Sequence, residues 1–477
     1  MTKYLLAVFF LLLLNSPEGT AKGAPQNLFS PPGTQTDESI TLLWDKPAVY
    51  EDVRGYNIYM SGKLVGETSK TNFRITGLSP ATGYEFSIRA KEENGRLSKT
   101  SRTTRVTTLK KRPVYNILDY GAKADEKTIN TEAIQKAIDA CRPGSVVYIP
   151  RGTFKSGAIH LKSGVELYVA EGAVLKGSAD PGDYPMIVNR FEGWKLKTYS
   201  SLINAGQLDE RGLISVKDIA IRGKGVISGG GTELAGAMIK ANGERSLGRL
   251  ICIMNAENVD IQGVTVEESP CWTIHYVFSK NVSCHDLEIR SSVRRGDGID
   301  PDSSADSYIF NCTFSTSDDC IAIKSGKNPE GNVVNIPSRN IRITDCNFEE
   351  GHGISIGSEI SGGINNVLIR DCIAGPLLNG LQIKATKERG GYVKNVEVRD
   401  CVIQRIRILT SLPYNNDGDA APAPPKFENM LFVNLDMTKA GNQKSLIEVN
   451  GFPGKAHYTR DMLFKNIQLP PNPKVKA

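Results

Sequence analysis

Polar and apolar residues follow one short pattern nine times between Asp218 and Ile467. Each copy begins with Asp or Asn, continues with alternating apolar residues, and ends six positions later on a small or apolar residue. The copies start at residues 218, 258, 281, 306, 340, 366, 395, 429 and 461, so the period varies from 23 to 40 residues. Loops of variable length must therefore leave a constant strand core, and units this short are stable only when stacked. The pattern predicts a coiled β-solenoid with a long solvent-facing wall.

The residues before the repeats predict the first coil and its cover. Residues 130–138 have a polar cap and apolar residues spaced by three or four, which predicts a helix. Residues 145–150 and 165–169 alternate as strands. A helix over the first coil would protect an open sheet edge that could otherwise pair with other chains.

Residues 24–109 have a different pattern of polar and apolar residues, which predicts short strands around residues 40–44 and 56–59. The single Trp44, the Leu-x-Pro-x-Thr-x-Tyr corner ending at Tyr84, and the alternation of apolar residues to Ala90 resemble a fibronectin type III domain. The resemblance implies a small β-sandwich that acts as a spacer or docking module, with its ligand left open. Residues 110–113 are then a linker, and residues 114–477 form the second domain.

The N-terminus predicts export. Residues 1–21 combine Lys3, an apolar run of about ten residues from Leu5 to Leu14, and small residues before Ala21, as in a cleaved signal peptide. No other segment is long and apolar enough to span a membrane. We expect a secreted or periplasmic monomer. A net charge of +6 and a pI near 8.7 favour an acidic polymer as partner. The sequence has no cluster of basic residues of the kind that binds nucleic acid.

Nine cysteines allow two interpretations. Four of them, Cys312, Cys346, Cys372 and Cys401, occupy the same position in their coils, which predicts a stacked column of buried thiols. If a disulfide forms, Cys312 and Cys320 are the most plausible pair.

Three acidic residues stand in strand-like surroundings where carboxylates are costly. Asp297 precedes one apolar strand, and Asp318 and Asp319 precede another, so Asp297 and Asp318 are 21 residues apart. That separation can place the acids on neighbouring coils, about one strand spacing apart. Close carboxylates repel, so one is expected to hold a proton and act as a general acid while an ionised partner activates water. His352 lies between two glycines, and Lys384 ends a later strand.

These residues resemble the motifs of glycoside hydrolase family 28, the polygalacturonase family. Asp318-Asp319 and Gly351-His352-Gly353 match two of its four cleft signatures, and the phrases at residues 269–275, 300–304 and 354–359 are similar to the bacterial exo-acting branch. The resemblance covers most of residues 114–470. It implies an all-β protein in which a right-handed parallel β-helix, a pectin lyase-like solenoid, follows the sandwich.

The resemblance also implies an activity and a set of roles. The protein would hydrolyse α-linked galacturonosyl bonds in pectin with inversion, without a metal or other cofactor. Asp318 would be the general acid, Asp297 and Asp319 would hold the nucleophilic water, and His352 would tune Asp318. Inversion requires acid and base carboxylates roughly 6.5 to 9.5 Å apart. The substrate-binding candidates are Lys384, Gln382, Arg295, His275 and Glu359.

Two departures from the family pattern leave the substrate open. Arg295-Gly296 replaces the Asn-Thr before the first catalytic Asp, and Gln382 replaces the Arg of the Arg-Ile-Lys signature. Gln cannot bind a uronate carboxylate through two charge-assisted hydrogen bonds as Arg does. Either Arg294 and Arg295 compensate, or the neighbouring sugar is neutral, as rhamnose is in rhamnogalacturonan. We favour galacturonide cleavage because Asp318-Asp319 is kept.

Other functions remain alternatives. A pectate lyase of the same fold would need calcium-binding carboxylates beside a cationic base, and no suitable acidic cluster is evident. A carbohydrate-binding solenoid without catalysis is a further alternative, since two signatures are altered. Loops at residues 324–339 and 410–425 could block one end of the cleft, which favours exo over endo cleavage.

Overall fold

The computed structural model describes residues 23–375, 377–410, 418–440, 445–451, 459–471, 473 and 475–476. The predicted signal peptide and much of the predicted loop at residues 410–425 lie outside these residues. The described chain divides into two compact units, one built mainly from Ser39–Leu78 and Thr82–Thr108 and the other from Leu109 onward.

The first unit is a β-sandwich of two antiparallel sheets. One sheet has the order β1-β2-β5 and the other the order β4-β3-β6-β7. Their bounds are β1 Gln26–Phe29, β2 Ser39–Asp45, β3 Val53–Met60, β4 Lys63–Thr68, β5 Asn72–Thr76, β6 Gly83–Glu92 and β7 Thr104–Thr107. Trp44 packs edge-on against Tyr56, with ring centroids 5.4 Å apart. Alternate residues of β6 enter the same core, as the predicted alternation requires.

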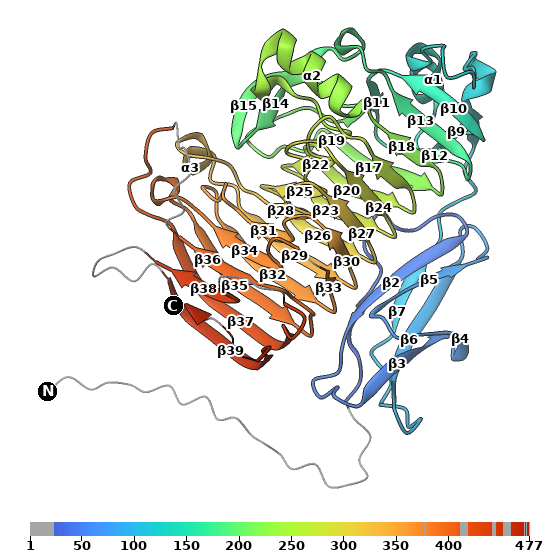
Figure 1. Cartoon of the computed structure of the whole chain (residues 1–477). Coiled ribbons are helices and arrows are strands. Elements are labelled where there is room, and N and C mark those ends of the chain that lie inside the picture. The colour runs from blue at the N-terminus through green and yellow to red at the C-terminus, as the bar shows by residue number, and fades with distance from the viewer. Residues whose placement is uncertain are drawn as a thin grey trace, which may run out of the picture. The chain divides into compact units, whose positions relative to one another are not determined.

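The second unit is a parallel β-helix, in which the described strands form three long parallel sheets (Figure 1). The first sheet consists of β10 Gly152–Ser156, β13 Ala173–Gly177, β18 Val226–Ser228, β21 Thr265–Glu267, β24 Glu288–Ser291, β27 Thr313–Thr316, β30 Asn347–Glu350 and β33 Ile373–Ala374. The second consists of β11 Ile159–Leu161, β16 Ile203–Ala205, β19 Ile251–Met254, β22 Ile274–Val277, β25 Ile299–Asp302, β28 Ile321–Ile323, β31 Ile354–Ile356, β34 Leu381–Lys384, β36 Ile406–Leu409, β38 Ile447–Asn450 and β40 Val475–Lys476.

The third sheet contains every predicted repeat. It consists of β8 Val114–Asn116, β9 Ser145–Ile149, β12 Val165–Val169, β17 Val216–Gly223, β20 Ala256–Gln262, β23 Lys280–His285, β26 Ala305–Phe310, β29 Ser338–Thr344, β32 Ile364–Arg370, β35 Tyr392–Arg399, β37 Lys426–Asp436 and β39 Thr459–Gln468. Inward-facing Ile, Val, Leu and Phe side chains of the three sheets form one continuous core. Each coil therefore buries its apolar face against its neighbours, as the repeat pattern predicts.

The polar residue that opens each repeat has a specific backbone role. All nine starting residues have positive φ, between 53° and 60°, a left-handed conformation that Asn and Asp tolerate better than other non-glycine residues. Their side chains also hydrogen-bond from coil to coil: Asn366 Nδ2 donates to Asn340 Oδ1 at 2.9 Å, and Asn429 Nδ2 donates to Asn395 Oδ1 at 2.6 Å. The repeat thus encodes a bend that recurs at one place in the coil.

The cysteines form no disulfide. All nine are described, buried and free, so the pairing of Cys312 with Cys320 is wrong as a prediction. Cys312 Sγ lies 3.5 Å from the carbonyl oxygen of Cys284, whereas Cys320 Sγ lies 3.2 Å from that of Glu350. The two thiols therefore pack on different parts of the coil. The column of Cys312, Cys346, Cys372 and Cys401 is buried as predicted.

The predicted cover helix is α1 Thr131–Ala140, which buries Ile134, Ala137 and Ile138 in the core of the first coils. Asn130 does not cap it through its side chain. Its Oδ1 instead accepts a hydrogen bond from the Lys123 amide at 2.7 Å, so the side chain stabilises the loop before the helix.

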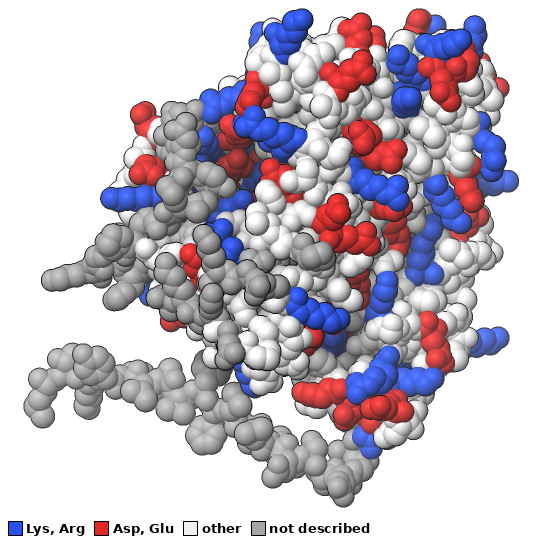
Figure 2. Space-filling view, in the orientation of Figure 1, with Lys and Arg blue, Asp and Glu red and all other residues white. Residues whose placement is uncertain are grey.

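Several further elements connect the strands of the coils. They are the hairpin β14 Met186–Phe191 and β15 Trp194–Tyr199, the helices α2 Gly231–Asn242 and α3 Glu330–Val334, and the short helices η1 Ile117–Tyr120, η2 Pro181–Asp183, η3 Glu244–Ser246 and η4 Lys387–Arg389. None of the helices in the described residues is long and apolar enough to cross a bilayer. On the face seen in Figure 2, acidic and basic side chains are interspersed.

Candidate active site

Strand register places the predicted acids and histidine in one line. Ile299, Ile321, Ile354 and Leu381 begin four successive strands of the second sheet and pair with one another in order. Asp297, Asp319 and His352 each lie two residues before one of these strand starts. Equivalent positions on parallel neighbours are about 4.8 Å apart. The coils therefore bring Asp297 and Asp318-Asp319 together, and it is Asp319 that matches Asp297 in register.

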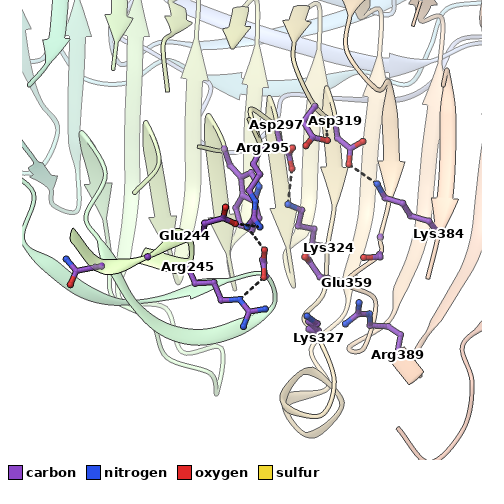
Figure 3. A pocket seen from close by; sticks show the side chains of 17 residues that line it. Glu244, Arg245, Arg295, Asp297, Asp319, Lys324, Lys327, Glu359, Lys384 and Arg389 are labelled. Atoms are coloured by element: carbon purple, nitrogen blue, oxygen red, sulfur yellow. Dashed lines mark hydrogen bonds and ion pairs between the residues drawn. The ribbon is translucent and has the colours of Figure 1, made fainter. Parts of the chain in front are cut away.

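These residues lie in a cleft of about 720 Å³ (Figure 3). Of the predicted residues, six line it: Asp297, Asp318, Asp319, Lys384, Arg295 and Glu359. Trp272, Lys324, Lys327, Arg389, Glu192, Glu244 and Arg245 are among the other lining residues. The cleft is therefore rich in both carboxylates and cations.

Asp297 is 4% exposed and is paired with Lys324, a residue that the sequence did not single out. The Lys324 ammonium lies 3.0 Å from Asp297 Oδ2, 2.7 Å from Asp300 Oδ1 and 3.4 Å from the centroid of a Trp272 ring. Burial raises the pKa of Asp297 well above its usual range, although Lys324 opposes the shift. Burial also raises the pKa of Asp300 to about 6. Lys324 is thus the cation that favours the ionised forms of these buried acids.

Asp318 has a different environment. His352 Nδ1 lies 2.9 Å from Asp318 Oδ1, and Asp318 also accepts a hydrogen bond from the Asp319 amide at 2.9 Å. Burial would raise the pKa of Asp318, but the hydrogen bond and charge of His352 outweigh it and lower the pKa. The same hydrogen bond raises the pKa of His352. The two side chains therefore share a proton in one charge-assisted hydrogen bond.

Asp319 is fixed from two later strands. Ser355 Oγ donates to its Oδ1 at 2.6 Å, and the Lys384 ammonium lies 3.2 Å from its Oδ2. Gln382 is buried on the strand that carries Lys384, where its Oε1 accepts from Asn379 Nδ2 at 3.4 Å. Lys384 thus contacts an acid of the site, a role distinct from the predicted contact with substrate.

One group of side chains could hold a metal ion. The ligand atoms of Asp318, Asp319 and His352 lie within 4.8 Å of one another. However, Lys384 already contacts Asp319, and the raised pKa of His352 favours its charged form. A dication would have to displace or deprotonate these groups, since a metal needs neutral imidazole. The arrangement therefore fits proton transfer better than metal binding.

The arginines expected to compensate for Gln382 are paired with acids. Arg295 binds Glu192 and lies 3.2 Å from Glu244, and Arg294 lies 2.9 Å from Glu244. Arg295 lines the cleft, whereas the Arg294 side chain is 78% exposed and is not among the lining residues. Compensation by Arg294 is therefore not supported by its position.

His275 lies beneath the cleft. It is fully buried and packs edge-on against Trp272 at 5.2 Å. Burial lowers its pKa to about 4, so it is neutral at pH 7, and its Nε2 is 3.5 Å from Asp302. Trp272 lines the cleft and His275 does not, so the position of His275 favours a packing role over the predicted contact with a sugar. Glu359, by contrast, lines the cleft as predicted.

A parallel β-helix with several carboxylates in one cleft is typical of carbohydrate-active enzymes, and the comparisons identify the family. The model "Glycosyl hydrolases family 28" matches residues 190–471, "Rhamnogalacturonase A/epimerase, pectate lyase-like" matches residues 114–180, and "Fibronectin type III domain" matches residues 23–107. The chain belongs to glycoside hydrolase family 28 and is a glycoside hydrolase.

Its relatives have the same architecture or activity class. An exo-poly-alpha-D-galacturonosidase of Dickeya chrysanthemi is 27% identical over 96% of this chain and 89% of its own length. An endo-polygalacturonase of Pectobacterium parmentieri is 31% identical over 73% of this chain and 85% of its own length. The structure of a family 28 exopolygalacturonase of Yersinia enterocolitica, 25% identical, aligns with a TM-score of 0.82 over 94% of this chain and 99% of that chain.

Proposed function

We propose that the protein is a secreted or periplasmic hydrolase of α-linked galacturonosyl bonds in pectin that works from a chain end. The observation that carries the proposal is the line of Asp297, Asp319 and His352 on successive coils, with Asp318 bonded to His352, in one cleft. Relatives named as polygalacturonases, including exo-acting ones, support the substrate class.

The proposed mechanism is a single displacement with inversion. Asp318 protonates the glycosidic oxygen as the bond breaks, and the proton comes from the hydrogen bond that Asp318 shares with His352. Asp297, which contacts Lys324, and Asp319, which contacts Lys384, orient a water, and one of the two carboxyl groups accepts its proton. Because the lowered pKa of Asp318 favours its ionised form, the proton that Asp318 delivers must be supplied by His352, whose pKa the same hydrogen bond raises. No step requires a metal ion.

Exo cleavage is supported by what lines the cleft besides the catalytic strands. The hairpin β14–β15 contributes Glu192, and η3 contributes Glu244 and Arg245. The predicted loop at 324–339 contributes Lys327. Asn328 in that loop donates to the carbonyl oxygen of Asp419 at 2.8 Å, which joins two loops. Such walls would restrict the cleft to a chain terminus.

The test is product analysis over time on polygalacturonate and, separately, on rhamnogalacturonan. We expect monomer or a short uniform product first from polygalacturonate, with none from rhamnogalacturonan. Asp318→Asn should abolish reducing-sugar release while polymer binding survives. Release from rhamnogalacturonan alone would contradict the substrate, and an unsaturated product absorbing in the ultraviolet would indicate a lyase. A protein that binds but never releases sugar would be a binding solenoid.

A further inference from the structure

Two cations line the cleft without belonging to the catalytic strands. Lys327 follows β28 in the loop that leads to α3, and Arg389 ends η4. Their exposed fractions are 5% and 2%. In Figure 3 the two side chains lie together on the side of the cleft away from Asp297 and Asp319. They come from loops 62 residues apart in the chain.

Both side chains are held in place by the same neighbourhood. The Lys327 ammonium lies 4.0 Å from the centroid of a Trp194 ring, and Trp194 Nε1 donates to the carbonyl oxygen of Asn328 at 3.0 Å. Asn328 Oδ1 accepts from a terminal nitrogen of Arg389 at 2.9 Å. Because these contacts fix the side chains before a ligand arrives, binding costs little additional side-chain entropy.

The pair has the chemistry that a uronate carboxylate needs. A guanidinium can bind a carboxylate through parallel charge-assisted hydrogen bonds, and an ammonium adds a point charge. In a partly dehydrated cleft these contacts are stronger than at an exposed surface. Gln382, which stands where the family pattern has Arg, can offer neither.

Glu359 adds a complementary group beside the pair. It lines the cleft and lies between Lys324 and the Lys327–Arg389 pair in Figure 3. Its Oε2 is buried and accepts no hydrogen bond from the described residues. A carboxylate oxygen in this position suits a sugar hydroxyl, which donates, and it would repel a second carboxylate. Cations and acceptor together would set the orientation of one charged sugar.

We propose that Lys327 and Arg389 bind the carboxylate of a uronate sugar in the cleft and so take over the role that Gln382 cannot perform. The inference rests on the proposed cleavage of galacturonides and specifies how the enzyme would recognise them. A sugar without a carboxylate, such as rhamnose or a methyl-esterified galacturonate, would lose both charged contacts at this subsite.

Binding measured by calorimetry in an Asp318→Asn background tests the proposal without turnover. The probes are trigalacturonate and its fully methyl-esterified form. We expect Arg389→Gln, and separately Lys327→Gln, to raise the Kd of trigalacturonate by roughly 10- to 100-fold. The Kd of the ester should change little. Arg389→Lys, which keeps the buried charge, should lose less affinity for trigalacturonate than Arg389→Gln.

Arg407→Gln is the matched control. Arg407 lies on β36 of the second sheet, 3.0 Å from Glu448, and is not among the residues that line the cleft. We expect it to leave both Kd values unchanged. An equal loss of acid and ester binding in the Arg389 variant, or no loss, would overturn the proposal. If the wild-type enzyme releases galacturonate while these variants keep their preference for the acid, only this inference fails. If the wild-type enzyme cleaves no galacturonan, the proposed function fails.

Discussion

Replacing Lys324 with methionine tests whether one buried cation favours ionisation of Asp297, the proposed catalytic base. The Lys324 side chain is 6% exposed and contacts Asp297 at 3.0 Å and Asp300 at 2.7 Å. At 3 Å, each pair is worth about 5 kcal/mol at an effective dielectric constant of about 20. Part of that energy offsets the dehydration of the charges, and removing one partner of a buried pair costs about 3–5 kcal/mol.

The loss should appear in both stability and rate. Without Lys324, the buried carboxyl groups of Asp297 and Asp300 would lose the ammonium that contacts them both. Their pKa values, already raised by burial, would therefore rise further. The protonated base cannot activate water, so initial rates on polygalacturonate should fall by roughly 100-fold or more near pH 5. The acid limb of the pH–rate profile should move to higher pH, and urea unfolding should give the loss of stability.

Two comparisons separate this reasoning from a general effect of losing a lysine. Lys217→Met removes an exposed ion pair of similar length, 2.9 Å to Glu257, and should cost about 1 kcal/mol or less. Adding Asp300→Asn to Lys324→Met removes a buried charge and should recover part of the stability. A Lys324→Met enzyme with an unchanged acid limb and a stability loss no larger than that of Lys217→Met would refute the argument.

Three further predictions concern other titratable groups. His352→Ala should reduce the rate and move the basic limb of the pH–rate profile, because the proton shared with Asp318 is lost; an unchanged profile would exclude the shared proton. Burial opposes the charge of His285, but Asp260 and Asp286 raise its pKa from 6.5 to about 9. The charged form of His285 therefore stabilises the fold by about 3 kcal/mol below pH 6.5, and this contribution is lost as the pH rises through about 9. His285→Gln should therefore destabilise the protein more at pH 6 than at pH 10 in urea unfolding, and equal losses would contradict the charge. Dialysis against a chelator should leave the rate of hydrolysis unchanged. If the rate fell and one divalent ion restored it, a metal would be placed at Asp318, Asp319 and His352.

The repeated part of the fold could be predicted from sequence because a backbone constraint is written into it. A left-handed residue at one place in each coil favours Asn or Asp, and the apolar alternation that follows fixes which side chains enter the core. The separation of 21 residues between Asp297 and Asp318, close to the length of one coil, indicated that these acids meet. It could not decide that Asp319 rather than Asp318 matches Asp297, because that depends on where each strand starts.

Residues outside the repeat left weaker signals. Lys324 follows Asp319 by five residues, yet only the path of β28 shows that its ammonium turns back to Asp297 and Asp300. Lys327 and Arg389 come from loops with no periodicity, so their meeting depends on the tertiary structure. The spacing of Cys312 and Cys320 suggested a disulfide because sequence distance does not reveal which side of a coil each thiol occupies.

The electrostatics of the cleft separate two carboxyl groups that have the same intrinsic pKa. Asp297 is buried more deeply than Asp318, which raises its pKa and makes its ionisation depend on Lys324. Asp318 is partly exposed, and the hydrogen bond from His352 lowers its pKa while placing the proposed proton donor, His352 Nδ1, 2.9 Å from Asp318 Oδ1. Each carboxyl group is therefore controlled by a different cation, and each cation lies on a different strand end. An inverting hydrolase needs such independent control, because the acid must give up its proton in the same step in which the base accepts one.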